Sequence, residues 1–214
     1  MRATATAPRD DPRTAIPHAE PGNVIGLFGG SFNPPHSGHR LVADVALSRL
    51  GLDQLWWLVT PGNPLKDHSQ LAPLGERLDA VAALARHPRM RVTALEARLG
   101  TSYSARTVDL LRQKRPRLRF VWIMGADNLA GFHRWQDWRG LMESVPVAVI
   151  DRPGATLSAL WSPAAQTFSG RRVDEQDAGL VARQQAPAWT FLHGPRDPSS
   201  STRIRAGQAG ARMS

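Results

Sequence analysis

Short apolar segments alternate with segments of helical periodicity along most of this chain. A strand buried on both faces is a short, continuous apolar run, whereas an amphipathic helix repeats its apolar residues every three or four positions. The sequence predicts strands at 24–28, 54–60, 90–95, 120–124, 145–150 and 189–193. It predicts helices at 39–50, 74–86, 104–114, 127–131, 135–143, 174–185 and 201–209. This alternation favours an α/β fold with a doubly wound parallel sheet and right-handed crossovers.

The length predicts one domain preceded by an arm. A chain of 214 residues is long enough for one sizeable core. Residues 1–22 carry both charge signs and several prolines without an apolar segment, so they are unlike a secretory signal. We therefore expect a flexible N-terminal arm over residues 1–22 and a single domain over residues 23–214.

The chain contains no cysteine and no apolar run of membrane-spanning length. The missing thiols exclude disulfides, thiolate metal ligands and a cysteine nucleophile. A span needs about 18 consecutive apolar residues, so no membrane partner is expected. The composition agrees with a cytoplasmic protein.

Basic residues exceed acidic ones by 27 to 18, which gives a net charge of +9 and favours an anionic partner. Almost all of the cations are arginine. The densest group comprises Arg112, Lys114, Arg115, Arg117 and Arg119, where a predicted helix ends. Cations suit a helix C-terminus, and no aromatic side chains are interspersed among these for base stacking. A solvated surface is therefore favoured over a nucleic-acid-binding surface.

Glycines, prolines and two histidines follow the first predicted strand. The segment, which we call the histidine loop (residues 29–39), reads Gly-Gly-Ser-Phe-Asn-Pro-Pro-His-Ser-Gly-His. Glycines allow backbone amides to approach a ligand closely, and a helix N-terminus attracts anions. His36 and His39 are three residues apart at that terminus, so both can face one anion. Read singly, each would be an ordinary surface histidine; together they predict a phosphate site.

Other known phosphate and catalytic patterns are absent. The sequence has no GxxxxGK[ST] P-loop, no GxGxxG after the first strand, no HExxH and no GxSxG. The HxGH pattern formed by His36 and His39 instead resembles the signature of the nucleotidyltransferase superfamily. The longer string GLFGGSFNPPHSGH resembles the bacterial nicotinate mononucleotide adenylyltransferases in particular. The resemblance extends from about Val24 to Arg205 and implies a Rossmann-like nucleotidyltransferase domain.

A second stretch, residues 200–205, resembles the ISSTxIR signature of the same superfamily, although Ser199 replaces its usual isoleucine. Small hydroxyls and amides at a helix start, followed one turn later by an arginine, suit the outer phosphates of a triphosphate. The resemblance implies an ATP site formed by Gly29, Gly30, Ser31, Phe32, His36, His39, Arg152, Ser200, Ser201, Thr202 and Arg205. It implies catalytic roles for His36, His39 and Arg205.

Three further segments match the family between these two motifs. They are Pro64-Leu65-Lys66, Ser102-Tyr103-Ser104, and Gly125-Ala126-Asp127 with Trp135. The resemblance implies that Asp127 lies near a ribose and that Trp135 stacks on a pyridine ring. The mononucleotide-binding residues that it implies are Lys66, Ser104, Gly125, Asp127 and Trp135.

The expected reaction is adenylyl transfer from ATP to nicotinate mononucleotide, which yields deamido-NAD and pyrophosphate. Magnesium is expected to be carried by ATP, with no protein metal site. Nicotinamide mononucleotide and phosphopantetheine are alternative acceptors. A non-catalytic, basic nucleic-acid-binding module is an alternative of another class, although no nucleic-acid partner is expected. The sequence makes no prediction of oligomeric state.

Overall fold

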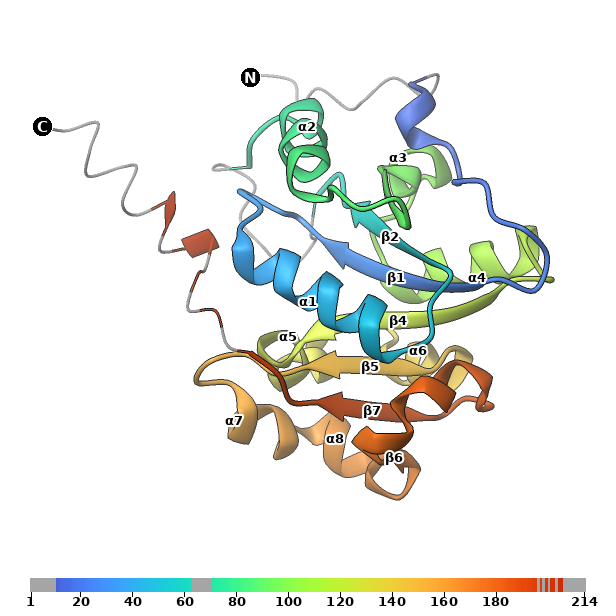
Figure 1. The fold of residues 1–214 in the computed structure, drawn as a ribbon, viewed down its shortest axis with the longest axis vertical. Coiled ribbons are helices and arrows are strands. Elements are labelled where there is room, and N and C mark those ends of the chain that lie inside the picture. The colour runs from blue at the N-terminus through green and yellow to red at the C-terminus, as the bar shows by residue number, and fades with distance from the viewer. Residues whose placement is uncertain are drawn as a thin grey trace, which may run out of the picture.

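A computed structural model describes residues 11–62 and 71–195, together with 197, 199, 201, 202, 204 and 205. Its centre is a seven-stranded sheet in the order β3-β2-β1-β4-β5-β7-β6 (Figure 1). Every strand pair is parallel. The strands are β1 (Val24–Gly30), β2 (Gln54–Val59), β3 (Met90–Thr93), β4 (Arg119–Gly125), β5 (Val147–Ile150), β6 (Arg172–Val173) and β7 (Trp189–Leu192).

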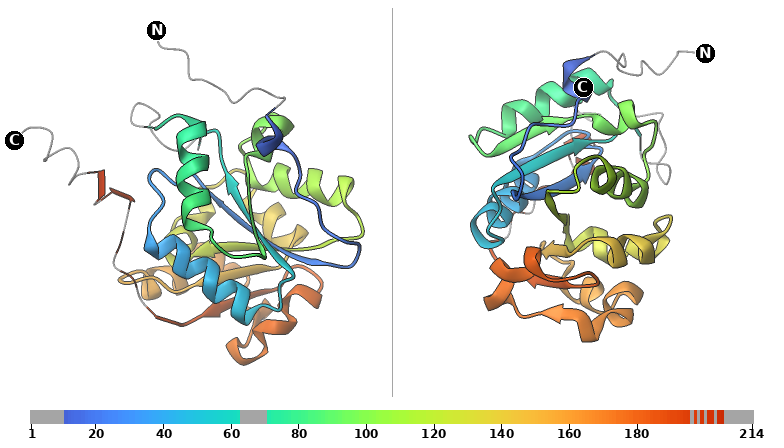
Figure 2. Two further views of the ribbon diagram at one scale, coloured as in Figure 1. Left: turned by 45° about the horizontal axis from the view of Figure 1, so that its top comes forward. Right: turned by 90° about the vertical axis from the view of Figure 1, so that its right-hand side faces the viewer.

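Helices cover both faces of the sheet (Figure 2). The α-helices are α1 (Ser37–Arg49), α2 (Leu74–Leu84), α3 (Leu95–Leu99), α4 (Ser104–Lys114), α5 (Ala126–Ala130), α6 (Trp138–Ser144), α7 (Thr156–Leu160) and α8 (Pro163–Thr167). The 3-10 segments are η1 (Pro12–Thr14), η2 (Phe132–Arg134), η3 (Ser169–Arg171) and η4 (Glu175–Arg183). The expected doubly wound parallel sheet is confirmed.

Two hydrophobic cores lie on opposite faces of the sheet because successive side chains of a strand point to opposite sides. On β4, Trp122 joins the core under α3 to α8, and its neighbours Val121 and Ile123 join the core under α1, α2 and η4. The whole of 120–124 is therefore buried, as its continuous apolar run predicted. No helix of the described ranges is long and apolar enough to cross a bilayer.

The differences from the predicted elements concern ends and short segments. The strand expected from Val145 starts at Val147, because Val145 caps α6 and Pro146 has no N–H to donate. The helix expected at 174–185 is the 3-10 segment η4. Helices α3, α7 and α8 have five residues each and were not predicted, whereas the equally short α5 was expected at 127–131. Of 201–209, the described residues 201, 202, 204 and 205 are helical.

Part of the expected arm is packed against the domain. Thr14, in η1, is completely buried. The Thr93 hydroxyl lies 3.0 Å from the Arg13 carbonyl oxygen and 2.8 Å from that of Ala15, and the Ala94 amide donates to the Arg13 carbonyl at 2.8 Å. Residues 13–15 therefore continue the contacts of β3, which differs from the expectation of a flexible arm through residue 22.

Candidate active site

The two histidines of the histidine loop lie against each other at the start of α1, with their ring planes tilted by 38°. His36 is the N-cap and is 7% exposed. The centroids of the two imidazole rings are 3.8 Å apart. The His36 backbone N–H donates to Nδ1 of His39 at 3.3 Å. A neutral His39 therefore carries its proton on Nε2, where it can donate to a ligand.

Close packing gives the histidine loop its shape. Phe32 has a φ of 45°, in the left-handed region, and its ring is 2% exposed. That ring meets the His39 ring at a centroid distance of 5.1 Å and lies so close to Gly30 that a Cβ there would be 3.0 Å from it. A Cβ on Gly38 would come within 3.1 Å of the His36 ring. The ring of Phe32 thus belongs to the core and fixes the course of the loop.

Arg152 and Asp127 approach the histidines from the ends of β5 and β4. A Cβ on Gly125 would collide with Asp127 Oδ1 and lie 3.2 Å from Arg152 Cγ, so the glycine makes room for both side chains. Burial lowers the pKa of His36, and the Arg152 guanidinium lowers it further. Asp197 and Asp127 raise that pKa, which places all of these charges around one imidazole.

The second motif docks on the first. Ser201 donates from its hydroxyl to the Pro34 carbonyl at 2.8 Å, and Arg205 donates from Nη1 to the Asn33 carbonyl. The hydroxyl oxygens of Ser199 and Ser37 are 2.9 Å apart. Serine at 199, where the family signature usually has isoleucine, therefore makes a polar contact with the first turn of α1.

Further polar contacts hold this C-terminal segment, by which we mean the described residues among 197–205. Nη2 of Arg152 donates to the Ser199 carbonyl at 2.9 Å. Asp197 Oδ1 accepts the Ser199 backbone N–H at 2.8 Å. Hydrogen bonds from Ser199 and Ser37 lower the pKa of Asp197 to about 2, so its carboxylate is ionised at neutral pH. The structure thus brings together the expected residues His36, His39, Arg152, Ser201 and Arg205, beside Gly29, Gly30, Ser31 and the exposed Thr202.

Trp135 and Asp127, which were expected at the mononucleotide site, lie next to this cluster. The Trp135 ring is partly buried, with centroid distances of 5.2 Å to Phe132 and 6.5 Å to Trp122. Trp122 in turn packs over Gly29, where a Cβ would lie 2.8 Å from it. Ser104 begins α4, and Asp127 is exposed in α5. Lys66 and Ser200 lie outside the described residues, so their expected roles stay predictions.

Arg77 and Glu96 are buried charged residues near the candidate site that were not predicted. Arg77 is 2% exposed and Glu96 is 3% exposed. A signal for Arg77 was present, because it lies on the apolar face of its helix with Leu74, Leu78 and Val81. Glu96 follows Ala94 and Leu95 directly, and the sequence offered no comparable pattern for it.

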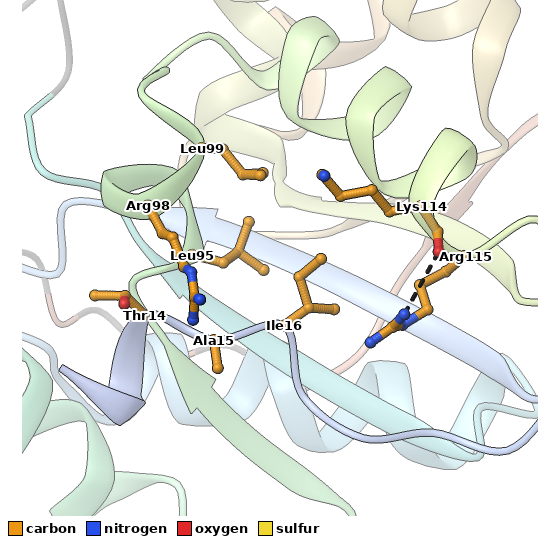
Figure 3. A pocket seen from close by; sticks show the side chains of 8 residues that line it. All are labelled: Thr14, Ala15, Ile16, Leu95, Arg98, Leu99, Lys114 and Arg115. Atoms are coloured by element: carbon orange, nitrogen blue, oxygen red, sulfur yellow. Dashed lines mark hydrogen bonds between the residues drawn. The ribbon is translucent and has the colours of Figure 1, made fainter. Parts of the chain in front are cut away.

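A separate cavity lies between the arm, α3 and the end of α4 (Figure 3). Its volume is about 430 Å³. Apolar side chains meet three cations there, and the lining residues are Thr14, Ala15, Ile16, Leu95, Arg98, Leu99, Lys114 and Arg115. None of the expected site residues lines this cavity, so it is distinct from the candidate active site.

A family model described as cytidylyltransferase-like matches residues 27–207. The match contains both the histidine loop and the C-terminal segment. The fold and the docked motifs therefore define a nucleotidyltransferase of the cytidylyltransferase-like class.

Similar curated proteins show to which family within this class the chain belongs. A Rhizobium meliloti protein named probable nicotinate-nucleotide adenylyltransferase is 62% identical over 187 residues, which cover 87% of this chain and 100% of the relative. A Brucella abortus protein of the same name is 60% identical and covers 85% of this chain and 94% of the relative. The chain belongs to the nicotinate-nucleotide adenylyltransferase family.

Solved structures support the same fold. A Plasmodium falciparum nicotinic acid mononucleotide adenylyltransferase complexed with NaAD has a TM-score of 0.63, with 17% sequence identity, and covers 86% of this chain and 83% of that chain. The same enzyme complexed with APC has a TM-score of 0.60 at 16% identity, with the same coverage. At this identity the likeness concerns the fold alone.

Proposed function

We propose that this protein transfers an adenylyl group from ATP to nicotinate mononucleotide, forming deamido-NAD and pyrophosphate. The observation that carries the proposal is the docking of the second motif on the histidine loop, through Ser201 and Arg205, beside His36 and His39. The names of the 60%-identical relatives support this reaction and this acceptor.

In this proposal the triphosphate lies between the two docked motifs. The backbone of Gly29, Gly30, Ser31 and Phe32 and the amides at the start of α1 face the α-phosphate. Arg152 contributes positive charge beside His36. The β- and γ-phosphates lie against the hydroxyls of Ser201 and Thr202 and the guanidinium of Arg205 in the C-terminal segment. Ser200, which lies outside the described residues, is expected to contribute a further hydroxyl.

The chemistry needs no protein nucleophile. A phosphate oxygen of the mononucleotide attacks the α-phosphorus, its new P–O bond forms, and the bond from that phosphorus to the bridging oxygen breaks. The electron pair of the broken bond leaves with pyrophosphate. Catalysis is therefore positioning plus stabilisation of developing charge. The Nε2 proton of His39 donates to the α- or bridging oxygen, and the approach of phosphate favours protonation of His36, whose pKa is otherwise lowered.

The acceptor lies on the side of α4 and α5. Backbone amides at the start of α4, at Ser104, suit the nicotinate carboxylate because a helix N-terminus favours an anion. Asp127 accepts from a ribose hydroxyl, and Gly125 leaves room for the Asp127 side chain. Lys66, which lies outside the described residues, is expected to bind a phosphate. Trp135 offers the pyridine ring a partly buried aromatic face.

Magnesium fits this site as a companion of ATP. The described residues hold no group of three histidine, aspartate or glutamate side chains close enough to form a metal cage. Magnesium prefers few protein ligands and substrate phosphates, and when bound it neutralises phosphate charge. Asp127, whose charge acts on His36, is a carboxylate that could support its hydration shell. We also infer a cytoplasmic location, since a cysteine-free chain needs no oxidising compartment.

The test is product formation with purified protein, ATP and magnesium. Pyrophosphate release and deamido-NAD are measured with nicotinate mononucleotide, nicotinamide mononucleotide and phosphopantetheine as acceptors. We expect the highest kcat/KM with nicotinate mononucleotide, because amides at Ser104 favour a carboxylate. A higher kcat/KM for either other acceptor would overturn the acceptor assignment, and no product with any of them would overturn the reaction.

A further inference from the structure

Four buried polar side chains link the histidine loop to the start of α4. They are Thr60 (8% exposed), Arg77 (2%), Glu96 (3%) and Thr107 (0%). Burial of a polar group is costly unless it is hydrogen-bonded, and the cost is largest for charged groups. Their hydrogen bonds therefore show what they hold in place.

Arg77 joins the end of β2 to the histidine loop. Its Nη1 donates to the carbonyl oxygens of Ser31 and Thr60, both at 2.8 Å. Its Nε donates to the Ala72 carbonyl at 2.9 Å, and Nη2 donates to that of Pro61 at 3.3 Å. Burial lowers the pKa of Arg77 to about 10, so the guanidinium is still charged at neutral pH. This one side chain thereby holds the carbonyl of Ser31, within the loop proposed to face ATP.

Glu96 joins the same end of β2 to α4. The Thr107 hydroxyl donates to Glu96 Oε1 at 2.9 Å, and a second hydrogen bond connects Glu96 to the Thr60 side chain. The Thr107 hydroxyl also lies 3.2 Å from the Tyr103 carbonyl oxygen, at the N-cap of α4. Thr60 is the shared member, since its carbonyl accepts from Arg77 and its hydroxyl meets Glu96.

The protonation state of Glu96 decides which hydrogen bonds the Thr60 and Thr107 hydroxyls can make. Burial raises the pKa of Glu96 to about 7, and its described hydrogen-bond partners are two uncharged hydroxyls. An ionised Glu96 only accepts, so both threonine hydroxyls donate to it. A protonated Glu96 donates to one of them, and that threonine is then able to donate to a loop carbonyl, either Tyr103 at 3.2 Å or Gly62 at 3.3 Å.

We propose that Arg77, Thr60, Glu96 and Thr107 form a hydrogen-bonded chain that positions the ATP-binding loop and the nicotinate-binding start of α4 relative to each other. The inference rests on the proposed function for the identity of the two substrates. The four side chains touch neither substrate, so they are positioning residues. A change at one end of the chain alters the binding of the substrate at the other end.

The decisive variants lie at the two ends. Thr107→Val keeps the shape of a fully buried residue and removes the hydroxyl beside α4. We expect it to raise the KM for ATP, as well as that for nicotinate mononucleotide, by about fivefold or more, the lower end of usual coupling between sites. Arg77→Lys, which cannot keep all four bonds, is expected to raise the KM for nicotinate mononucleotide as well as that for ATP. If Thr107→Val changes only the KM for nicotinate mononucleotide, the substrate proposed to lie beside α4, the proposed hydrogen-bonded chain is wrong.

A matched control is available in β7. Thr190 is also fully buried, and its hydroxyl has no hydrogen-bond partner among the described residues. Thr190→Val therefore removes a buried hydroxyl that does not belong to the hydrogen-bonded chain, and it should leave both KM values unchanged. If Thr190→Val raises both KM values as Thr107→Val does, general loosening of the core explains the effect and the proposal fails.

Hydrogen exchange tests the chain without using activity. In the Thr107→Val protein we expect faster amide exchange in residues 30–37 as well as at the start of α4. Faster exchange confined to α4 would overturn the proposal. If the wild-type protein makes no deamido-NAD, the proposed function fails. The exchange experiment then still decides whether the four hydrogen-bonded side chains connect the histidine loop to the start of α4.

Glu96→Gln separates hydrogen bonding from titration. Glutamine can donate and accept, so its KM values should stay near wild type, whereas Glu96→Leu should raise both. The folded protein holds an extra proton between the ordinary pKa of 4.5 and the raised value of about 7, so wild-type stability falls as pH rises through that window. Glu96→Gln should lack this fall when Tm is measured from pH 4.5 to 8. An identical fall in both proteins, or wild-type KM values in Glu96→Leu, would contradict the role of Glu96.

Discussion

The histidine loop and the C-terminal segment meet at one site but are held in different ways. Packing fixes the loop, because the Phe32 ring is 2% exposed and Gly30 and Gly38 have neighbours where a Cβ would be. The C-terminal segment is held by individual polar contacts, such as those of Ser201 with Pro34 and of Arg152 with Ser199.

Because the two regions are held differently, substitutions in them should have different effects. A closely packed loop has no alternative arrangement of similar energy, so an added or removed group displaces the imidazoles. A single hydrogen bond contributes about 0.5–1.5 kcal/mol, so each contact of the C-terminal segment can be lost with a graded effect. Substitutions in the loop that displace the imidazoles should therefore act on kcat, and substitutions in the segment on the KM for ATP.

The largest effect is expected for His39→Ala. Its imidazole is held by the His36 amide and by the Phe32 ring, so no other side chain can take its place. We expect kcat to fall by about 10²–10³, the usual loss for a preorganised donor to transition-state charge. Pyrophosphate release measures it, with His18→Ala as the control because the His18 side chain is 85% exposed. Unchanged turnover in His39→Ala would remove this histidine from the mechanism.

A methyl group on Gly38 should have the next largest effect. The Cβ would lie 3.1 Å from the His36 ring and 3.3 Å from Arg152 Nη2, so both groups must move. We expect kcat to fall by about ten- to hundredfold, as for small displacements of aligned groups. Gly170→Ala is the control, since a Cβ there has no neighbour within 4 Å. Equal kcat values for the two variants would mean that the loop is less closely determined than its packing indicates.

The same contrast explains what could be predicted from the sequence. Phe120 to Met124 has one interpretation, a strand buried on both faces, and this was confirmed. Helices α7 and α8 were missed because five residues make little more than one helical turn, a length at which α5 was predicted and these two were not. The start of β5 was misplaced by two residues because an apolar pattern does not register the helix cap at Val145.

The sequence predicted some residues of the candidate site and missed others, also according to how local their pattern is. The histidine loop has a local pattern, so its position at the start of α1 followed from the sequence. The docking of Ser201 on Pro34 joins residues 167 positions apart, which only the resemblance to a family implied. Arg77 and Glu96 were missed because their roles depend on backbone carbonyls and hydroxyls from other elements, and a sequence pattern does not show those distances.

Arg205→Gln should have an intermediate effect, seen in the KM for ATP. The change removes the charge that we propose for the outer phosphates and weakens the contact with the Asn33 carbonyl. We expect the KM for ATP to rise about tenfold, as for loss of a hydrogen bond to a charged group, with a smaller change in kcat. Arg49→Gln, which alters an exposed ion pair with Glu175, is the control. A fall in kcat without a change in KM would place Arg205 with the loop histidines.

The smallest effect is expected for Ser201→Ala. The variant loses the 2.8 Å hydrogen bond to the Pro34 carbonyl, while the contacts of Ser199 and Arg205 still hold the C-terminal segment on the loop. Loss of one neutral hydrogen bond corresponds to about a two- to tenfold rise in the KM for ATP, with kcat unchanged. Ser48→Ala in α1 removes a comparable hydroxyl, which bonds the Val45 carbonyl at 3.0 Å, and should leave both parameters unchanged. A Ser201→Ala enzyme that loses kcat as severely as His39→Ala would show that the segment is as indispensable to the chemistry as the loop.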